Sequence, residues 1–310
     1  MAGKTVDALV MQKSGKCQLK LLQLVLTLCC VPLFSCLPSW QDRIVVGSKN
    51  FTEQLILGEL IAQQLEAKTH LLVERRFYLA GTFICQQAML AGRIDIYPEY
   101  TGTALTAILK QNPGGTAREV YDRVKAEYGR RFRFDLGPPF GFNDTFAIEI
   151  RGEDARRLHL KTISQAANYT PHWRAGFGYE FMERPDGYKG LAATYSLRFA
   201  EPPRIMDLGL LSRALKEKQV DLIAGNTTDG LIPALDLFVL EDDRHYFPPY
   251  EAVPVVRDEA VEKHPAIMTA LNDLAGKITD QEMQQLNYAV DGQHRDAKDV
   301  VAEFRKKKQL

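Results

Sequence analysis

Short apolar runs alternate with segments whose apolar residues repeat at helical intervals along most of the chain. The first run is Ile44–Val46, and the helical repeat that follows it places apolar residues at Leu57, Leu60, Ile61 and Leu65. A similar unit extends from Leu72 through Gly81 to Leu90, and Ile94–Tyr97 leads into a helix that begins at Thr101. Later strand-like runs are Phe146–Ile150, Val220–Ala224, Phe238–Leu240 and Val253–Val256. This alternation predicts an α/β fold.

Helix-start signals add detail to this pattern. Asn50 with Glu53, and Thr279 with Glu282, have the spacing of a capping box. From Pro265 onward the pattern is helical throughout, with segments Pro265–Gly276, a helix opened by Thr279, and Ala297–Lys307. No internal repeat or low-complexity linker divides the chain, so crossovers rather than a flexible tether would separate two domains.

Two strand-to-helix turns stand out. Residues 47–66, GSKNFTEQLILGELIAQQLE, and residues 95–109, DIYPEYTGTALTAIL, each read as a strand that passes through a Gly, Ser or Thr turn into a helix start. The first turn of a helix has backbone N–H groups without intrahelical partners, which favour an anion. Two such turns in one chain suggest a site for a small-molecule carboxylate.

Composition and charge exclude several functions. The 310 residues, 45% hydrophobic and 25% charged, are enough for two globular domains. Lys plus Arg and Asp plus Glu both number 39, so no basic field attracts nucleic acid. We interpret the basic cluster 305–308 as the end of a helix. The sequence has no evident phosphate loop, nucleophile elbow, metal-ligand spacing of histidines or paired catalytic carboxylates. We therefore expect that the protein is not an enzyme and has no cofactor.

The N-terminal segment has the pattern of an export signal. Three lysines, Lys13, Lys16 and Lys20, precede the apolar run Leu21–Phe34, which is interrupted by a glutamine and a proline. A comfortable membrane span needs about 20 apolar residues, so this run is too short. The end of the run, Leu33-Phe34-Ser35-Cys36, resembles a bacterial lipobox, although Phe34 is unusual there. We expect residues 1–36 to form a lipoprotein-type signal with Cys36 as the acylated residue; the alternative is an uncleaved signal anchor.

Cysteine positions agree with that interpretation. Four of the five cysteines, Cys17, Cys29, Cys30 and Cys36, lie in the export segment. Cys85 is therefore alone in the rest of the chain, and one cysteine makes neither an internal disulfide nor a metal site. Because it lies in a helical pattern, we expect a buried structural thiol.

A family resemblance is carried by seven motifs in order. They are GSKNFTEQ, AGTFICQQAMLAGRIDIYPEYTGTAL, GFNDTFA, RPDGYKGL, TTDGL, DDRHYFPPYEAVPVV and LNYAVDG. In this order they resemble the substrate-binding proteins of osmoprotectant ABC importers, which bind glycine betaine, carnitine or choline. The resemblance extends from Arg43 to Phe304. Each motif alone is weak, but seven in order over the whole body are specific.

The resemblance implies a two-lobed type II periplasmic-binding-protein fold that closes on its ligand by a hinge. It places the first lobe at residues 43–145 plus 250–310 and the second lobe at residues 146–249. Hinge strands are expected near Phe142–Ile150 and Phe247–Val253, with the C-terminal helices packed on the first lobe. The ligand would lie in the cleft between the lobes, where binding sites commonly form.

The chemistry of such a ligand indicates the residue types that would bind it. A quaternary ammonium group donates no classical N–H hydrogen bond, so its binding depends on aromatic faces. The resemblance implies Tyr100 and Tyr250 as aromatic cage residues, and Lys49, Thr103 and Arg184 as the groups that hold a carboxylate. An arginine can form a planar fork with a carboxylate that a lysine cannot form.

Two departures from the family pattern bear on the ligand. Phe146 stands where relatives have tyrosine, and Asn226 stands where some relatives have a cage tyrosine. Asn226 could hydrogen-bond a hydroxyl, amide or imidazole-type group, so carnitine, choline and ergothioneine stay open beside glycine betaine. Asp144 is a candidate contact for the cationic end, with an Asx turn at the hinge as the equal alternative.

The resemblance also implies the setting in which the protein acts. We expect a monomeric, non-enzymatic receptor in the periplasm or at the cell surface, anchored by a lipid or by its signal segment. It would deliver its ligand to an ABC permease and the ATPase of that permease. Alternatives are a pocket for another solute such as an amino acid, a sensory module, or an enzyme that reuses the fold.

Overall fold

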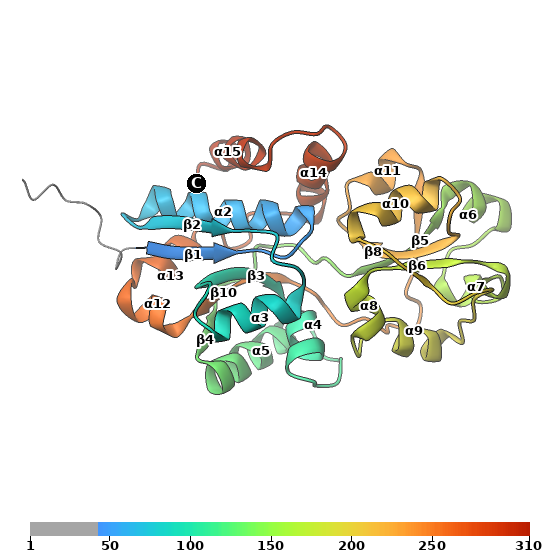
Figure 1. The fold of residues 1–310 in the computed structure, drawn as a ribbon, viewed down its shortest axis with the longest axis horizontal. Coiled ribbons are helices and arrows are strands. Elements are labelled where there is room, and N and C mark those ends of the chain that lie inside the picture. Colours follow the sequence, from blue (N-terminus) through green and yellow to red (C-terminus); the bar gives the residue numbers. More distant parts are fainter. Residues whose placement is uncertain (1–42) are drawn as a thin grey trace, which may run out of the picture. The chain divides into compact units, whose positions relative to one another are not determined.

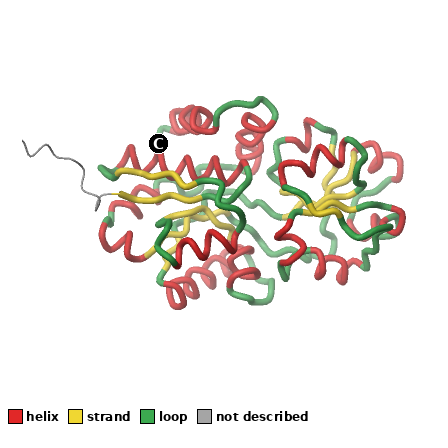
Figure 2. Tube along the Cα trace, in the orientation of Figure 1, coloured by secondary structure: helices red, strands yellow, loops and turns green. Residues whose placement is uncertain are grey.

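The computed structural model describes residues 43–310, which form two five-stranded sheets with helices on both faces of each (Figure 1). We call the first sheet and the helices packed on it the first lobe, and the second sheet and its helices the second lobe. Strands and helices alternate along most of the chain, as Figure 2 shows by colour. The predicted α/β fold is confirmed. The predicted signal segment and Cys36 lie outside the described residues.

The first sheet is built from the N-terminal strands and one strand that returns from late in the chain. Its order is β2-β1-β3-β10-β4, with β1 parallel to β2 and β3, and β10 antiparallel to β3 and β4. The strands are β1 (Arg43–Gly47), β2 (Leu72–Arg76), β3 (Ile96–Tyr100), β4 (Phe134–Leu136) and β10 (Ala252–Arg257). Four of them, β1, β2, β3 and β10, coincide with or lie beside a predicted apolar run, whereas β4 was not predicted.

Helices cover both faces of this sheet. One face carries α2 (Thr52–Lys68), and α13 (Ala266–Asn272), α14 (Asp280–Asp291) and α15 (Ala297–Lys308) pack on α2. The other face carries α3 (Thr82–Leu90), α4 (Thr101–Thr103), the π-helical turn η2 (Ala104–Ile108) and α5 (Ala117–Phe132). The short α12 (Asp258–Lys263) follows β10. The prediction that the C-terminal segment is helical is confirmed.

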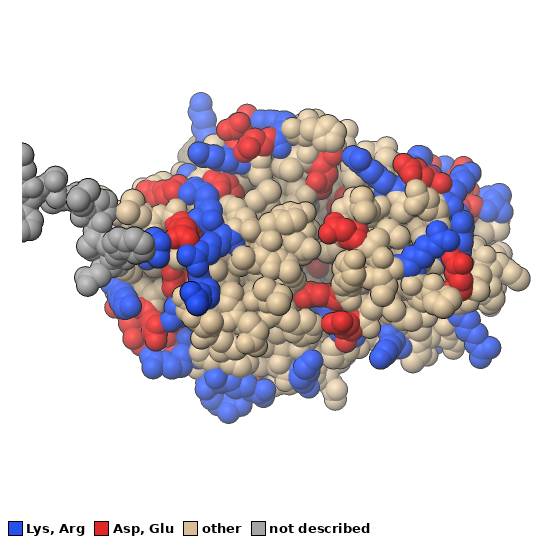
Figure 3. Space-filling view, in the orientation of Figure 1, with Lys and Arg blue, Asp and Glu red and all other residues tan. Residues whose placement is uncertain are grey.

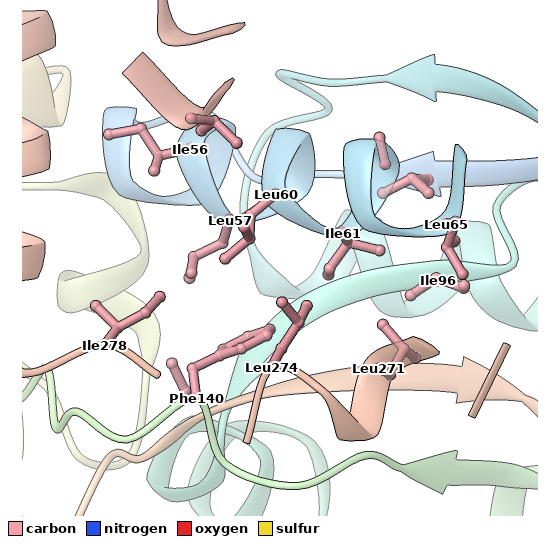
Figure 4. Packing of buried hydrophobic residues seen from close by; sticks show 14 of the residues in the cluster. Ile56, Leu57, Leu60, Ile61, Leu65, Ile96, Phe140, Leu271, Leu274 and Ile278 are labelled. Atoms are coloured by element: carbon pink, nitrogen blue, oxygen red, sulfur yellow. The ribbon is translucent and has the colours of Figure 1, made fainter. Parts of the chain in front are cut away.

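The core of the first lobe follows from the alternation of side chains along its strands. In β1, Ile44 and Val46 face the α2 side while Val45 faces the α3 side, as expected for a strand buried on both faces. Figure 4 shows side chains of α2 pointing toward β3, the loop after β4 and the C-terminal segment. The labelled members are Ile56, Leu57, Leu60, Ile61, Leu65, Ile96, Phe140, Leu271, Leu274 and Ile278.

The second lobe has the same plan. Its sheet has the order β7-β6-β8-β5-β9, with β6 parallel to β7 and β8, and β5 antiparallel to β8 and β9. The strands are β5 (Phe146–Arg151), β6 (Ala175–Phe177), β7 (Arg204–Ile205), β8 (Leu222–Asn226) and β9 (Leu237–Leu240). The helices are α6 (Gly152–Leu158), α7 (Ile163–Ala166), η3 (Thr170–His172), α8 (Tyr179–Glu183), α9 (Tyr188–Tyr195), α10 (Leu208–Lys216) and α11 (Leu231–Ala234).

The chain passes between the two sheets twice, once between β4 and β5 and once between β9 and β10. The two passages run side by side. Asn143 and Glu251 form an antiparallel bridge, and the backbone N–H of Asp144 donates to the carbonyl of Tyr250 over 3.1 Å. These segments are the ones that the sequence predicts as hinge strands. Their role as a hinge, and the exact lobe boundaries, stay predictions.

One predicted helix start is wrong. The N-cap of α2 is Phe51, which has no side-chain cap, so Asn50 and Glu53 do not form a capping box. Glu53 instead turns into the protein and accepts hydrogen bonds there. The second predicted box is confirmed, because Thr279 and Glu282 exchange both capping hydrogen bonds at the start of α14. The spacing motif does not distinguish a capping carboxylate from one that a tertiary contact engages.

Charge is mixed over the surface. On the face drawn in Figure 3, Lys and Arg side chains are interspersed with Asp and Glu rather than gathered in one basic field. The basic residues 305–308 form the last turn of α15, as the sequence indicated. No helix among residues 43–310 has the length and apolar character needed to cross a bilayer. Cys85 is a buried free thiol, and burial raises its pKa to about 12.

Candidate ligand site between the two lobes

A cavity of about 430 Å³ lies between the lobes, with residues of both in its walls. All eight residues that the sequence predicts as ligand contacts line this one cavity. They are Lys49, Tyr100, Thr103, Asp144, Phe146, Arg184, Asn226 and Tyr250. Their sequence positions span about 200 residues, so the fold brings together side chains that only the motif order had connected. Their contact with a ligand stays a prediction.

The cavity residues lie at the ends of strands. Lys49 follows β1, and Tyr100 ends β3 directly before the helix that contains Thr103. In the second lobe, Phe146 begins β5 and is paired in register with Asn226, the last residue of β8. Strand ends leave side chains free to converge, which is where open α/β sheets form their ligand sites.

Aromatic rings form much of the cavity wall. Phe51 stacks on Tyr100 with ring centroids 6.4 Å apart. Phe146 lies edge to face with Phe181 at 4.8 Å and with Tyr250 at 5.8 Å. The sequence argument did not name Phe51 or Phe181. Phe51 belongs to the motif GSKNFTEQ and was open to recognition there, whereas Phe181 is placed only by the tertiary fold.

Arg184 is already engaged by a side chain of the protein. Its Nε and Nη2 donate to the two carboxylate oxygens of Asp186 at 2.9 and 2.5 Å, and both side chains are buried. The Tyr250 hydroxyl donates to the same carboxylate over 2.5 Å. The Arg184 guanidinium also lies 4.9 Å from the ring centroid of Phe146. The planar fork expected for a ligand carboxylate is therefore formed with Asp186, and Nη1 has no hydrogen-bond partner among residues 43–310.

Lys49 is likewise paired within the first lobe. Its ammonium group forms a buried ion pair with Glu99 and lies 4.9 Å from the ring centroid of Tyr100. Glu99 also accepts from the Tyr97 hydroxyl at 3.1 Å and from the Tyr100 backbone N–H at 2.7 Å. Glu99 is therefore a structural acceptor at the end of β3. Neither lysine nor arginine of the predicted site is an unpaired cation.

Two carboxyl groups meet at a threonine of the second lobe. Glu53 accepts from the Thr228 hydroxyl at 2.5 Å, from the Tyr100 hydroxyl at 2.7 Å and from the Asn287 amide at 3.0 Å. Asp144 accepts from the Thr228 backbone N–H at 3.3 Å. Burial raises the pKa of both carboxyl groups, and the Glu53 charge raises that of Asp144 further. Asp144 thus links the passage between the lobes to the second lobe.

A smaller cavity of about 140 Å³ adjoins the first. The two share part of their walls, including Asn50, Phe51, Leu208 and Asn226. Asn226 therefore lies where a ligand in the larger cavity would approach the smaller one. The smaller cavity is also lined by polar groups that include Ser212 and Asp229, whose side chains are hydrogen-bonded to each other over 2.8 Å.

Other residues that could take part in binding are possible metal ligands and Trp173. Within residues 43–310, no group of His, Cys, Asp and Glu is arranged to hold a metal ion. Trp173 stacks on Tyr169 with ring centroids 6.0 Å apart. The aromatic cavity between the lobes has a volume and lining that fit a small organic ligand.

Comparison with known families agrees with this geometry. Residues 42–307 match the model of the substrate-binding domain of ABC-type glycine betaine transport systems. The chain belongs to this family. The match includes both lobes and both passages between them.

Relatives and solved structures give the same assignment for this binding protein. It is 36% identical over 273 residues to the carnitine transport binding protein OpuCC of Listeria monocytogenes, covering 87% of this chain and 88% of that one. It is 35% identical over 265 residues to the ergothioneine transport permease/binding protein EgtU of Helicobacter pylori, covering 85% of this chain and 47% of that one. A crystal structure titled as a glycine betaine/carnitine/choline ABC transporter aligns with a TM-score of 0.71 and 32% identity over 86% of this chain and 98% of that one.

The family assignment makes the chain a substrate-binding component of an ABC importer, and its fold is the two-lobed periplasmic-binding-protein fold. The two departures from the family pattern now have positions. Phe146 keeps an aromatic face in the wall but offers no hydroxyl, and Asn226 places an amide between the two cavities. The expectation that both influence which solute is bound stays a prediction.

Proposed function

We propose that this protein captures a quaternary ammonium solute in the cavity between its lobes and delivers it to an ABC permease. The observation that carries the proposal is the composition of the cavity wall. Aromatic rings of both lobes, among them Tyr100 and Phe146, line this cavity. The lysine and the arginine in its wall are each paired with a carboxylate of the protein. Such a wall suits a cation that donates no hydrogen bond, because ring faces attract it electrostatically.

Contacts across the cleft support capture by closure. Thr228 of the second lobe donates to Glu53 of the first, and the Asn287 side chain of α14 donates to the Thr228 carbonyl at 2.9 Å. A ligand in the cavity is enclosed while these contacts hold, and separation of the lobes frees it. The closed arrangement would present the loaded receptor to its permease.

The setting of the protein belongs to the same proposal. We infer that it acts outside the cytoplasmic membrane as a monomer, held there through Cys36 or its signal segment. Its partners are the permease and the ATPase of one importer. It releases its ligand unchanged rather than acting as an enzyme.

A thermal-shift screen tests the proposal. The panel is choline, glycine betaine, proline betaine, carnitine, ergothioneine and a set of amino acids. A ligand at one hundred times its Kd stabilises the protein by about 2.7 kcal/mol. A shift with at least one trimethylammonium compound supports the proposal. A shift with amino acids alone, or chemical change of a betaine by the protein, contradicts it.

Ergothioneine is the second candidate because of Asn226. An amide at the junction of the two cavities can hydrogen-bond an imidazole-type group, and the Helicobacter pylori relative is named for ergothioneine. Asn226→Ala separates the two candidates. If the amide contacts the imidazole-type ring, this variant should raise the Kd of ergothioneine much more than the Kd of glycine betaine. If it does not, the ratio of the two Kd values should stay unchanged.

A further inference from the structure

Helix α3 of the first lobe is capped by a side chain of the second lobe. Its N-cap residue, Gly81, has no side chain to accept a hydrogen bond from the first turn. The Glu180 carboxylate, on α8, takes that place, because the backbone N–H of Phe83 donates to its Oε1 over 3.3 Å. Both α8 and the first turn of α3 line the ligand cavity. We call this contact the interlobe cap.

Gly81 makes this approach possible. A Cβ atom at position 81 would collide with the Glu180 carboxylate. The colliding group is the far end of a flexible side chain, so a larger residue would displace the carboxylate and leave the backbone in place. The absence of a side chain at Gly81 thus leaves space at the start of α3 for a carboxylate of the second lobe.

Charge explains why the contact holds. Among residues 43–310 the Glu180 carboxylate has no ion-pair partner, and the two cations of the cavity wall are paired elsewhere, Lys49 with Glu99 and Arg184 with Asp186. The partial positive charge at the start of a helix attracts a carboxylate, and its free N–H groups donate to it. The start of α3 therefore donates directly to the Glu180 carboxylate and compensates its charge.

We propose that Glu180 is a positioning residue that holds the second lobe on the first once the lobes have closed over a ligand. The inference rests on the proposed function. The contact joins the two lobes only when they meet, so it acts after the ligand has entered. It should slow ligand release and leave ligand entry unchanged, in keeping with the general rule that contacts formed late affect dissociation.

Rapid-mixing kinetics of ligand binding test the proposal with variants on both sides of the contact. Glu180→Gln removes the negative charge of the carboxylate, and Gly81→Ala fills the space that the carboxylate occupies. Each should raise the dissociation rate constant roughly three- to tenfold, with the association rate constant unchanged. Because both variants remove one contact, the double variant should release ligand no faster than the faster single variant.

Glu241→Gln is the control for the loss of a negative charge from the second lobe. Glu241 is exposed and follows β9, and it does not line the ligand cavity. The control should release ligand as the unaltered protein does. Equal acceleration by Glu241→Gln would assign the effect to charge alone and would overturn the interlobe cap, as would additive effects of Glu180→Gln and Gly81→Ala.

Hydrogen exchange of α3 provides a second readout, measured with a saturating ligand from the panel that holds the lobes closed. In the ligand-bound proteins the first-turn amides of α3 should exchange faster in Glu180→Gln and Gly81→Ala than in the unaltered protein, and Glu241→Gln should not change them. Unchanged exchange in both variants overturns the proposal. Faster exchange with an amino acid as the bound ligand, together with no binding of any quaternary ammonium compound, would uphold the interlobe cap and reject the proposed function.

Discussion

Replacing Arg184 by methionine distinguishes two roles for this arginine. If Arg184 holds the carboxylate of the ligand, its loss should weaken the binding of glycine betaine and carnitine. The binding of choline, which has no carboxylate, should stay unchanged. If the main partner of Arg184 is Asp186, the loss of Arg184 should destabilise the protein and affect all ligands alike. The structure favours the second role, because the planar fork of Arg184 is occupied by Asp186 at 2.9 and 2.5 Å.

The size of the effect follows from burial. The side chains of Arg184 and Asp186 are only 6% and 1% exposed. Burial alone would raise the pKa of Asp186, but the charge and hydrogen bonds of Arg184 keep that pKa below its usual value. Removing the arginine leaves an uncompensated buried carboxylate with the Tyr250 hydroxyl as donor. Breaking a buried pair in this way costs about 3–5 kcal/mol.

Urea unfolding of four proteins measures this cost: the unaltered protein, Arg184→Met, Asp186→Asn and the double variant. We expect Arg184→Met to lose about 3–5 kcal/mol of unfolding free energy at pH 7. The double variant should be more stable than Arg184→Met, since it no longer buries an unpaired charge. The Asp186 pKa is depressed in the folded state, so the pair's contribution should be present above the unfolded pKa and lost as pH falls through the folded one.

Two results would refute this reasoning. One is an unfolding free energy of Arg184→Met within about 0.5 kcal/mol of the unaltered protein, which is the range of an ordinary surface change. The other is selective loss of glycine betaine and carnitine binding with choline binding intact. The latter would return Arg184 to the role that the family resemblance implies.

Three further predictions concern two buried carboxyl groups and one ring of the cavity wall. Glu149→Met should raise the unfolding free energy by about 1 kcal/mol at pH 7, because neither carboxylate oxygen of this fully buried residue has a hydrogen-bond partner among residues 43–310. Asp144→Asn should gain stability relative to the unaltered protein as pH rises above about 4, because burial and the nearby Glu53 raise the Asp144 pKa, so the unfolded chain loses this proton while the folded protein still holds it. Phe51→Leu should raise the Kd of a quaternary ammonium ligand roughly fivefold in calorimetry, the equivalent of about 1 kcal/mol for one cation–π face.

Each of these has an outcome that contradicts it. A lower melting temperature for Glu149→Met would indicate that the carboxyl group has a stabilising partner. A pH-independent stability difference for Asp144→Asn would mean that Asp144 has an ordinary pKa in the folded protein. An unchanged Kd in Phe51→Leu would remove this ring from the ligand's surroundings.

Strands and helices were predictable because their signals are local. The run Ile44–Val46 and the spacing of Leu57, Leu60 and Ile61 reflect burial on a sheet and on a helix face, and both elements form as expected. The capping box at Thr279 depends on residues three apart and is also confirmed. Glu53 has the same spacing from Asn50, yet its carboxylate bonds to groups far away in the sequence. The spacing of residues along the chain does not show whether a carboxylate will cap its own helix or bond to distant groups.

The candidate site was predictable to the extent that motif order carries it. Tyr100, Arg184 and Tyr250 line one cavity, as the family resemblance implied. No sequence pattern indicated that Asp186 would occupy the fork of Arg184, although it lies only two residues away. Such partners depend on side-chain directions, which only the folded backbone fixes. The same holds for Glu180, whose partner helix lies in the other lobe.

The most direct test of the account is calorimetric titration of the protein with choline and with its uncharged isostere, in which a carbon atom replaces the nitrogen. The two compounds have the same shape and hydroxyl group, so a difference in affinity reports the ring faces' attraction for the positive charge. The account predicts saturable one-to-one binding of choline or of another trimethylammonium compound on the panel, and at least tenfold weaker binding of the matching isostere. Equal affinity for a charged compound and its isostere, or binding of neither across the panel, would contradict it.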